Sequence, residues 1–303
     1  MRSILCIVLM VILGWTNAVS AAMTSTNYQI PFDSLNSGGT DFSSSTNFNM
    51  NDTLGEQATG YGTSTNFMLH AGYRQSDENA MIALDVGAQE NLTQTAYTAF
   101  QSSGPATVTV ASTTSFATSS HISVVENRGL TQKLAVGKIT GITGNVITVD
   151  KWDGDNATMS AVPAGGDDFA FRTDGSAVQF GTLIPLVGTT SNVHTEVTTN
   201  ASTGYTLHVY SDGYLRTLTN HIKDVTDGLI SGDAEEYGAS VVGVKAVGVG
   251  SDFAVTTTHT LIQTSAGPGI NDRIGMNYKI FIVPATLAGS YTQHVTYLLT
   301  ANF

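Results

Sequence analysis

Apolar and polar positions alternate along two stretches near the middle of the chain, residues 193–197 (VHTEV) and 205–210 (YTLHVY). A period of two places successive side chains on opposite faces of a β-strand. Residues 200–204, which precede the second stretch, are of hairpin-loop length and end in glycine. The pattern therefore predicts an antiparallel hairpin with one buried face, and we expect this hairpin to be the centre of a β-sandwich.

Further strands are predicted on both sides of this centre. Residues 81–86 have the composition of a strand, 91–101 that of a polar connection, and 278–283 alternate until Pro284. The last strand is expected over 291–299, where alternate positions are apolar. Thr, Ser, Gly, Asn and Val dominate the chain and good helix-forming runs are scarce, so the predicted fold is all-β and antiparallel.

Residues 106–149 differ from the rest in having short, closely spaced strands separated by glycines. The predicted strands are 107–110, 121–125, 133–136, 138–140 and 145–149. Such spacing is typical of a small barrel or compact sandwich. We expect residues 97–175 to form a small β-barrel-like module inserted into a sandwich built from 80–96 and 176–303. An exposed loop tolerates an insertion because the cost of loop closure grows slowly with length.

A six-residue motif, S-T-N-aromatic-x-aliphatic, occurs three times near the N-terminus, at residues 25–30, 45–50 and 64–69. Each copy is predicted to begin a unit made of a short strand, a Gly-rich turn and a return strand. Three copies are too few for a solenoid. Residues 23–79 are therefore expected to form a β-meander repeat followed by a polar linker.

The first 22 residues have the pattern of a secretory signal peptide: Arg2, an apolar run over 4–13, and small residues over 18–22. Ten apolar residues span only about 15 Å as a helix, about half of a hydrocarbon core. We expect cleavage after Ala22, although Ala21 and Ser20 are nearly equivalent sites. The single cysteine, Cys6, lies in the apolar run, and no second run is long enough to be transmembrane. The predicted location is secreted, at the cell surface.

Charge and motifs exclude several function classes. The net charge is −12 and no Lys/Arg cluster is present to neutralise phosphates, so a nucleic-acid partner is not expected. The sequence contains no Gly-x-Ser-x-Gly, His-Glu-x-x-His, P-loop or cysteine-based motif. The adjacent pair Glu235–Glu236 would point to opposite faces of a strand. We therefore predict no enzyme activity.

Candidate ligands for a metal ion are few. His194 and His208 are predicted to face each other across the central hairpin, on the solvent side, where two imidazoles without a third ligand make a weak site. Carboxylates that suit Ca²⁺ occur in two Gly-rich segments, at Asp153, Asp155, Asp167 and Asp168. The same residue types form ordinary tight turns, and Ala157 breaks the EF-hand spacing. No metal or cofactor is predicted, and Ca²⁺ at these aspartates is the alternative.

Three stretches carry a resemblance: the repeat that ends at 71–73 (AGY), the segment 180–215 (FGTLIPL…TGYTLHVYSDGYL) and the ending 288–303 (AGSYTQHVTYLLTANF). They resemble exported bacterial cell-surface β-sandwich proteins, including proteins of candidate-phyla lineages. Residues 111–150 resemble small β-modules of phage-tail and surface proteins. The resemblance implies a sandwich fold and a surface role, with no catalytic residues.

Two functions are consistent with these observations. The first is a non-enzymatic structural or adhesive surface protein that associates with itself or with other surface proteins through sheet edges. The alternative is a carbohydrate- or Ca²⁺-binding module of a surface assembly, in which Trp152 and the tyrosines would offer flat faces to sugar rings. A single tryptophan is little for a lectin, so core or rim packing is the favoured role of Trp152.

Overall fold

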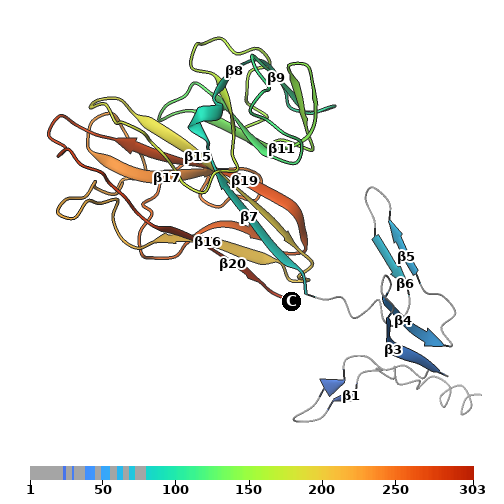
Figure 1. Ribbon diagram of the computed structural model, residues 1–303. Coiled ribbons are helices and arrows are strands. Elements are labelled where there is room, and N and C mark those ends of the chain that lie inside the picture. The colour runs from blue at the N-terminus through green and yellow to red at the C-terminus, as the bar shows by residue number, and fades with distance from the viewer. Residues whose placement is uncertain are drawn as a thin grey trace, which may run out of the picture. The chain divides into compact units, whose positions relative to one another are not determined.

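The computed structural model describes residues 80–303 and six short strands within residues 23–71. The chain divides into two units, Met1–Asn79 and Ala80–Phe303, and each is described by itself (Figure 1). The predicted signal peptide, 1–22, lies outside the described residues, as does the linker over 72–79.

In the N-terminal segment, one antiparallel strand pair flanks each copy of the repeated motif, so each pair joins the end of one predicted unit to the start of the next. The pairs are β1 with β2, β3 with β4, and β5 with β6, and they form separate two-stranded sheets. Their bounds are Met23–Thr24, Gln29–Ile30, Gly38–Ser44, Asn49–Leu54, Gly60–Thr63 and Met68–Ala71. The described strands therefore form three separate hairpins rather than the single meander that was predicted. The S-T-N-[YF] residues fall between the two strands of each pair, outside the described residues, whereas Gly38, Gly39 and Gly60, predicted as turns, lie in strands.

The larger part of the second unit is an antiparallel β-sandwich. One sheet has the order β17-β19-β15-β7 and the other has the order β18-β16-β20. The bounds are Ile82–Ala88 (β7), Thr189–Thr199 (β15), Tyr205–Ser211 (β16), Glu236–Val242 (β17), Thr260–Ser265 (β18), Gly269–Phe281 (β19) and Val295–Ala301 (β20). Apolar side chains from both sheets, such as Val193, Val197 and Leu207, form one buried core. The predicted all-β sandwich is confirmed.

The predicted central hairpin is wrong. β15 pairs with β7 and β19, and β16 pairs with β18 and β20, so the two strands belong to opposite sheets. The loop between them carries the chain across the core. Its Gly204 has a φ of +88°, and a Cβ there would lie 1.9 Å from the carbonyl oxygen of Ser265. Alternation correctly indicates which residues share a face, but it does not specify which strand is the hydrogen-bonded neighbour.

Residues 95–172 form a closed small barrel, as the strand spacing predicted. The strands follow one another in the order β10-β14-β8-β9-β12-β11, and β11 pairs back to β10, while the short β13 pairs with β11. The bounds are Thr95–Gln101 (β8), Thr107–Val110 (β9), His121–Glu126 (β10), Lys133–Thr143 (β11), Val146–Val149 (β12), Asp153–Gly154 (β13) and Phe169–Arg172 (β14).

Two local predictions within the barrel have clear outcomes. The stretch 91–101, predicted as a connection, contains the short 3₁₀ helix Asn91–Thr93 and strand β8, whose Tyr97 and Phe100 enter the barrel core. Trp152 is buried, packs 5.0 Å from Phe100 between ring centroids, and donates its indole N–H to the carbonyl of Gln101. Trp152 is therefore a core residue and offers no face to a sugar ring.

The barrel covers the outer face of the four-stranded sheet. Figure 1 shows β8, β9 and β11 grouped beside the sheet that holds β15, β17 and β19. Because of this cover, β15 is buried on both faces. Gln132 of the barrel donates to the amide oxygens of Asn192 and Asn277, at 2.7 Å each, and Leu134 and Phe171 pack with Val242. In the part of the chain that the structure describes, no helix is long and apolar enough to cross a membrane.

The proposed domain division, 80–96 with 176–303 against 97–175, stays a prediction. The sheets separate close to these limits, although residue 97 lies inside β8. Ala88 and Gly175 exchange backbone hydrogen bonds of 2.7 and 2.9 Å, so the chain enters and leaves the barrel side by side.

Candidate functional site

A cluster of ionisable side chains lies where the barrel meets the sandwich. On β15, the residues that alternate with the core-facing valines include His194 and Glu196, and these point toward the barrel. The expectation that His194 faces solvent is wrong, since the residue is 1% exposed. It also does not lie opposite His208, which is half-buried on β16 in the other sheet.

The partner of His194 is His121, the first residue of β10 in the barrel. The two rings stack with centroids 3.9 Å apart and an interplanar angle of 28°. The register neighbours of His194 are both glycines, Gly87 on β7 and Gly275 on β19, and Gly87 leaves room for the ring. A Cβ on Gly87 would lie 2.5 Å from Cε1 of His194. Neither ring nitrogen of His194 has a hydrogen-bond partner among the described residues.

Three carboxylates surround the ring of His121. Its Nε2 lies 3.4 Å from Oε2 of Glu196, and its Nδ1 lies 3.6 Å from Oδ1 of Asp174 and 3.7 Å from Oδ2 of Asp85. Burial favours the neutral ring, but hydrogen bonding to Asp174 and Glu196 outweighs it and raises the pKa of His121 above its usual 6.5. In Asp174, hydrogen bonds from the side chain and backbone of His121 and from Ser120 outweigh burial and hold the pKa of that carboxyl at about 2.

The two histidines differ in protonation. Burial, followed by the charges of His121 and Arg273, lowers the pKa of His194 to about 3. His194 is therefore a neutral imidazole near neutral pH, with a lone pair on one nitrogen.

The cluster also contains a buried arginine. The guanidinium of Arg273 (β19) donates from Nε to Oε2 of Glu196 at 2.9 Å and from Nη2 to Oδ2 of Asp150 at 3.0 Å. Nη2 contacts Glu196 as well, and Lys138 Nζ lies 3.7 Å from Oε1 of Glu196. Although burial would raise the pKa of Glu196, its contacts with His121 and Arg273 lower it to about 2. These contacts tie β15 and β19 of the sandwich to the barrel.

Within the described residues, Asp85, His121 and His194 are the three side chains whose potential ligand atoms all lie within 4.8 Å of one another. Two imidazole nitrogens and one carboxylate oxygen are a donor set used for transition metals. The sequence signal for this group was weak, because Asp85, His121 and His194 come from three segments separated by 36 and 73 positions.

The four aspartates considered from the sequence lie elsewhere. Asp153 contacts Lys151 at 3.2 Å and Arg273 at 3.5 Å. Asp155 accepts the backbone N–H of Leu134, and burial raises its pKa. Asp168 accepts the backbone N–H groups of Asn127 and Gly165, whereas Asp167 is exposed. Asp155 and Asp168 thus organise the local chain, and none of the four belongs to the Asp85 group. The alternative of Ca²⁺ at these residues stays a prediction.

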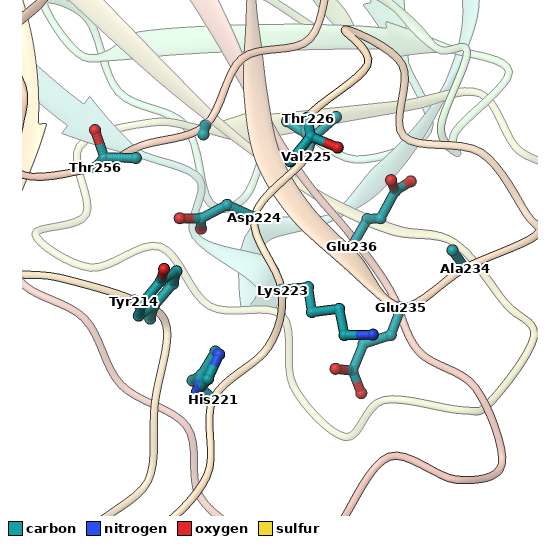
Figure 2. Close-up of a pocket in the computed structure, with 11 residues that line it drawn as sticks. Tyr214, His221, Lys223, Asp224, Val225, Thr226, Ala234, Glu235, Glu236 and Thr256 are labelled. Atoms are coloured by element: carbon teal, nitrogen blue, oxygen red, sulfur yellow. The ribbon is translucent and has the colours of Figure 1, made fainter.

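A second feature is an open pocket of about 470 Å³ on the sandwich (Figure 2). Tyr214 and His221 stack at its wall with ring centroids 4.4 Å apart. Carboxylates of Asp224, Glu235 and Glu236 also line it. Glu235 precedes β17 and Glu236 is its first residue, so the two are not consecutive residues of one strand and need not point to opposite faces of the sheet. Both line the pocket, and Figure 2 shows their carboxylates pointing in different directions.

The pocket carboxyls have altered proton affinities. Burial raises the pKa of Asp224, and its Oδ1 has no hydrogen-bond partner among the described residues. Burial also raises the pKa of Glu236, and the negative charges of Asp227, Asp252 and Asp233 add to this shift. Glu235 accepts a hydrogen bond from the hydroxyl of Thr286. The pocket therefore combines a flat aromatic wall with several acceptor groups.

A third feature is the edge strand β20, with the sequence VTYLLTA. It pairs with β16 on one side, and no described strand pairs with its other side. Its side chains alternate between half-buried and exposed, and it contains neither a charge nor a proline. These are the features that natural sheet edges usually avoid.

Comparison of the chain with protein-family models, with curated proteins and with solved structures finds no match. Fold and sites together define a class: an all-β protein in which a seven-stranded antiparallel sandwich is joined to a small closed barrel.

Proposed function

We propose that this protein is exported and acts without catalysis, as a structural or adhesive component of a cell surface that associates with copies of itself through sheet edges. The observation that carries the proposal is the uncharged, unpaired edge of β20. Monomeric proteins protect such edges with lysine, proline or bulges, because free backbone N–H and C=O groups recruit further strands.

The edge has suitable chemistry for strand addition. An added strand would form main-chain hydrogen bonds with β20 and place alternate side chains beside Thr296, Leu298 and Thr300, which are exposed. The N-terminal hairpins are short and poor in charge, so their strands are the proposed donors from a neighbouring copy. The competing arrangement is an N-terminal segment that pairs only within its own chain.

Export is supported by the apolar and small-residue pattern of residues 1–22. N-terminal sequencing of the native protein tests it. The expected mature N-terminus is at or near Met23, and an intact Met1 on the native protein would contradict export by this route.

Self-association is tested by light scattering over a wide range of protein concentration. Purified protein is expected to assemble, and Leu298→Lys is expected to suppress assembly because it places a charge on the edge strand. Leu218→Lys is the matched control, since Leu218 is fully exposed in a loop and belongs to no strand. A wild-type protein that stays monomeric at high concentration, or equal effects of the two lysines, would refute edge pairing.

A second function, glycan binding, is favoured by the pocket of Figure 2. The stacked Tyr214 and His221 offer a flat face and Asp224 and Glu236 offer acceptors for sugar hydroxyls. Binding to a glycan array should fall for Tyr214→Ala but not for Tyr210→Ala, because Tyr210 stacks on His259 outside the pocket. An array without any signal would exclude this function for the glycans displayed.

A further inference from the structure

We propose that Asp85, His121 and His194 bind a divalent transition-metal ion of the zinc class, and that the bound ion fastens the barrel to the sandwich. Asp85 and His194 belong to the sandwich strands β7 and β15, whereas His121 belongs to the barrel strand β10. The inference is independent of the proposed surface role.

The distances allow a common ion with small movements. Three atoms that lie within 4.8 Å of one another have a point no farther than about 2.8 Å from each of them (4.8 divided by the square root of 3). Zn²⁺ binds histidine nitrogen and carboxylate oxygen at about 2.0–2.2 Å. Each ligand atom therefore has to move inward by at most about 0.7 Å, and the stacked rings of His121 and His194 have to turn so that one nitrogen of each points at the ion.

The strongest indication is the state of His194. Its ring is 1% exposed, and both of its nitrogens lack a hydrogen-bond partner among the described residues. Buried polar groups are normally paired, and an unpaired one calls for a specific explanation. Gly87 on the neighbouring strand β7 makes room for this ring, whose nitrogens are unused. A metal ion supplies the missing partner.

The surroundings of His121 match the usual support of a metal-binding histidine. When its Nδ1 faces the site near Asp85, its Nε2 faces Oε2 of Glu196 at 3.4 Å. Metal-binding histidines typically direct the second ring nitrogen to a carboxylate, which fixes the tautomer and the ring orientation. Glu196 is itself held by Arg273, so this carboxylate has a fixed position.

Charge and access also suit a cation. The positive charge of Arg273 is matched by Glu196 and Asp150, and Arg273 contacts the same Glu196 oxygen, Oε2, that faces Nε2 of His121. Asp85 contacts no lysine or arginine among the described residues, and 58% of its side-chain surface is exposed, which gives an ion an entry path. Asp174 lies 3.6 Å from Nδ1 of His121 but outside the group of three, so water would complete the coordination.

The donor set selects the class of metal. Two imidazole nitrogens suit zinc, cobalt and nickel, whereas calcium and magnesium prefer oxygen alone. A metal link also has a physical purpose here. The chain contains one cysteine, so no disulfide within it can join the two cores.

The test uses the full chain after treatment with EDTA and buffer exchange. Titration with ZnCl₂ in a calorimeter is expected to show one ion bound per chain, and CoCl₂ is expected to give the visible absorption of a cobalt site with nitrogen and oxygen ligands. Asp85→Asn is expected to weaken zinc binding about 10-fold or more, and His194→Gln further. His208→Gln is the matched control and is expected to leave the affinity unchanged, because His208 lies on the other sheet.

The exposed Asp85 keeps the test decisive if the His194 variant does not fold. Circular dichroism establishes that the Asp85→Asn protein is folded. Absence of heat with ZnCl₂ in the wild-type protein, or zinc binding of unchanged affinity in folded Asp85→Asn, would overturn the proposal.

Discussion

Replacing Arg273 by methionine is expected to destabilise the unit that contains the sandwich and the barrel by about 3 kcal/mol. Methionine keeps much of the volume but removes the charge that Glu196 and Asp150 share. Breaking a buried ion pair from one side costs about 3–5 kcal/mol, because the other charge stays buried without compensation. The lower end applies here, since the Asp150 side chain is 26% exposed and can be hydrated, and Lys138 stays near Glu196.

Urea unfolding of the full chain, followed by fluorescence in buffer with EDTA, measures this change. For a unit of this size, about 3 kcal/mol corresponds to a fall in melting temperature of about 6–12 °C. The dependence of unfolding free energy on urea should stay the same if the unit still unfolds as one. Arg216→Met is the control, because Arg216 pairs with Asp212 at the surface, where solvent screens the pair and its loss should change stability little.

The double variant Arg273→Met with Glu196→Gln separates lost attraction from buried charge. Only 7% of the Glu196 side chain is exposed, so removing its charge should recover part of the loss caused by Arg273→Met. A loss below about 1 kcal/mol in Arg273→Met, or a double variant whose loss equals the sum of the two single losses, would refute the reasoning.

Two further predictions concern the junction. Gly87→Ala should lower the free energy of unfolding by about 2 kcal/mol or more, because the new Cβ would lie 1.9 Å from the carbonyl oxygen of Thr173 and 2.5 Å from His194. The control Gly141→Ala should change it by less than about 0.5 kcal/mol, since no atom lies within 4 Å of that Cβ. Similar losses in urea unfolding of both variants would contradict the close packing at Gly87. Replacing residues 91–171 by a short Gly/Ser loop should leave a sandwich that unfolds cooperatively in urea, because Glu90 and Arg172 already lie in contact and the sandwich core contains no residue of the barrel. Loss of the cooperative transition would show that the two cores fold only together.

The local pattern of the sequence predicted the class of fold and most strands. Alternation located β15 and β16, and the closely spaced strands separated by glycines indicated the small barrel. The structure adds the pairing of strands that closes it. Trp152 was correctly expected in packing. These features depend on residues close together in the chain, and side-chain alternation is a property of any strand regardless of its partners.

The junction was decided by the tertiary structure alone. In the sequence, His194 and Glu196 have the spacing of a solvent-facing row, yet the barrel covers them and brings His121 onto His194. β15 and β16 have the pattern of a hairpin, yet each pairs with strands distant in the chain. The period of a strand specifies two faces but not what covers each face or which strand lies beside it. Those are set by contacts between distant segments, where the free energy of packing and hydrogen bonding is gained.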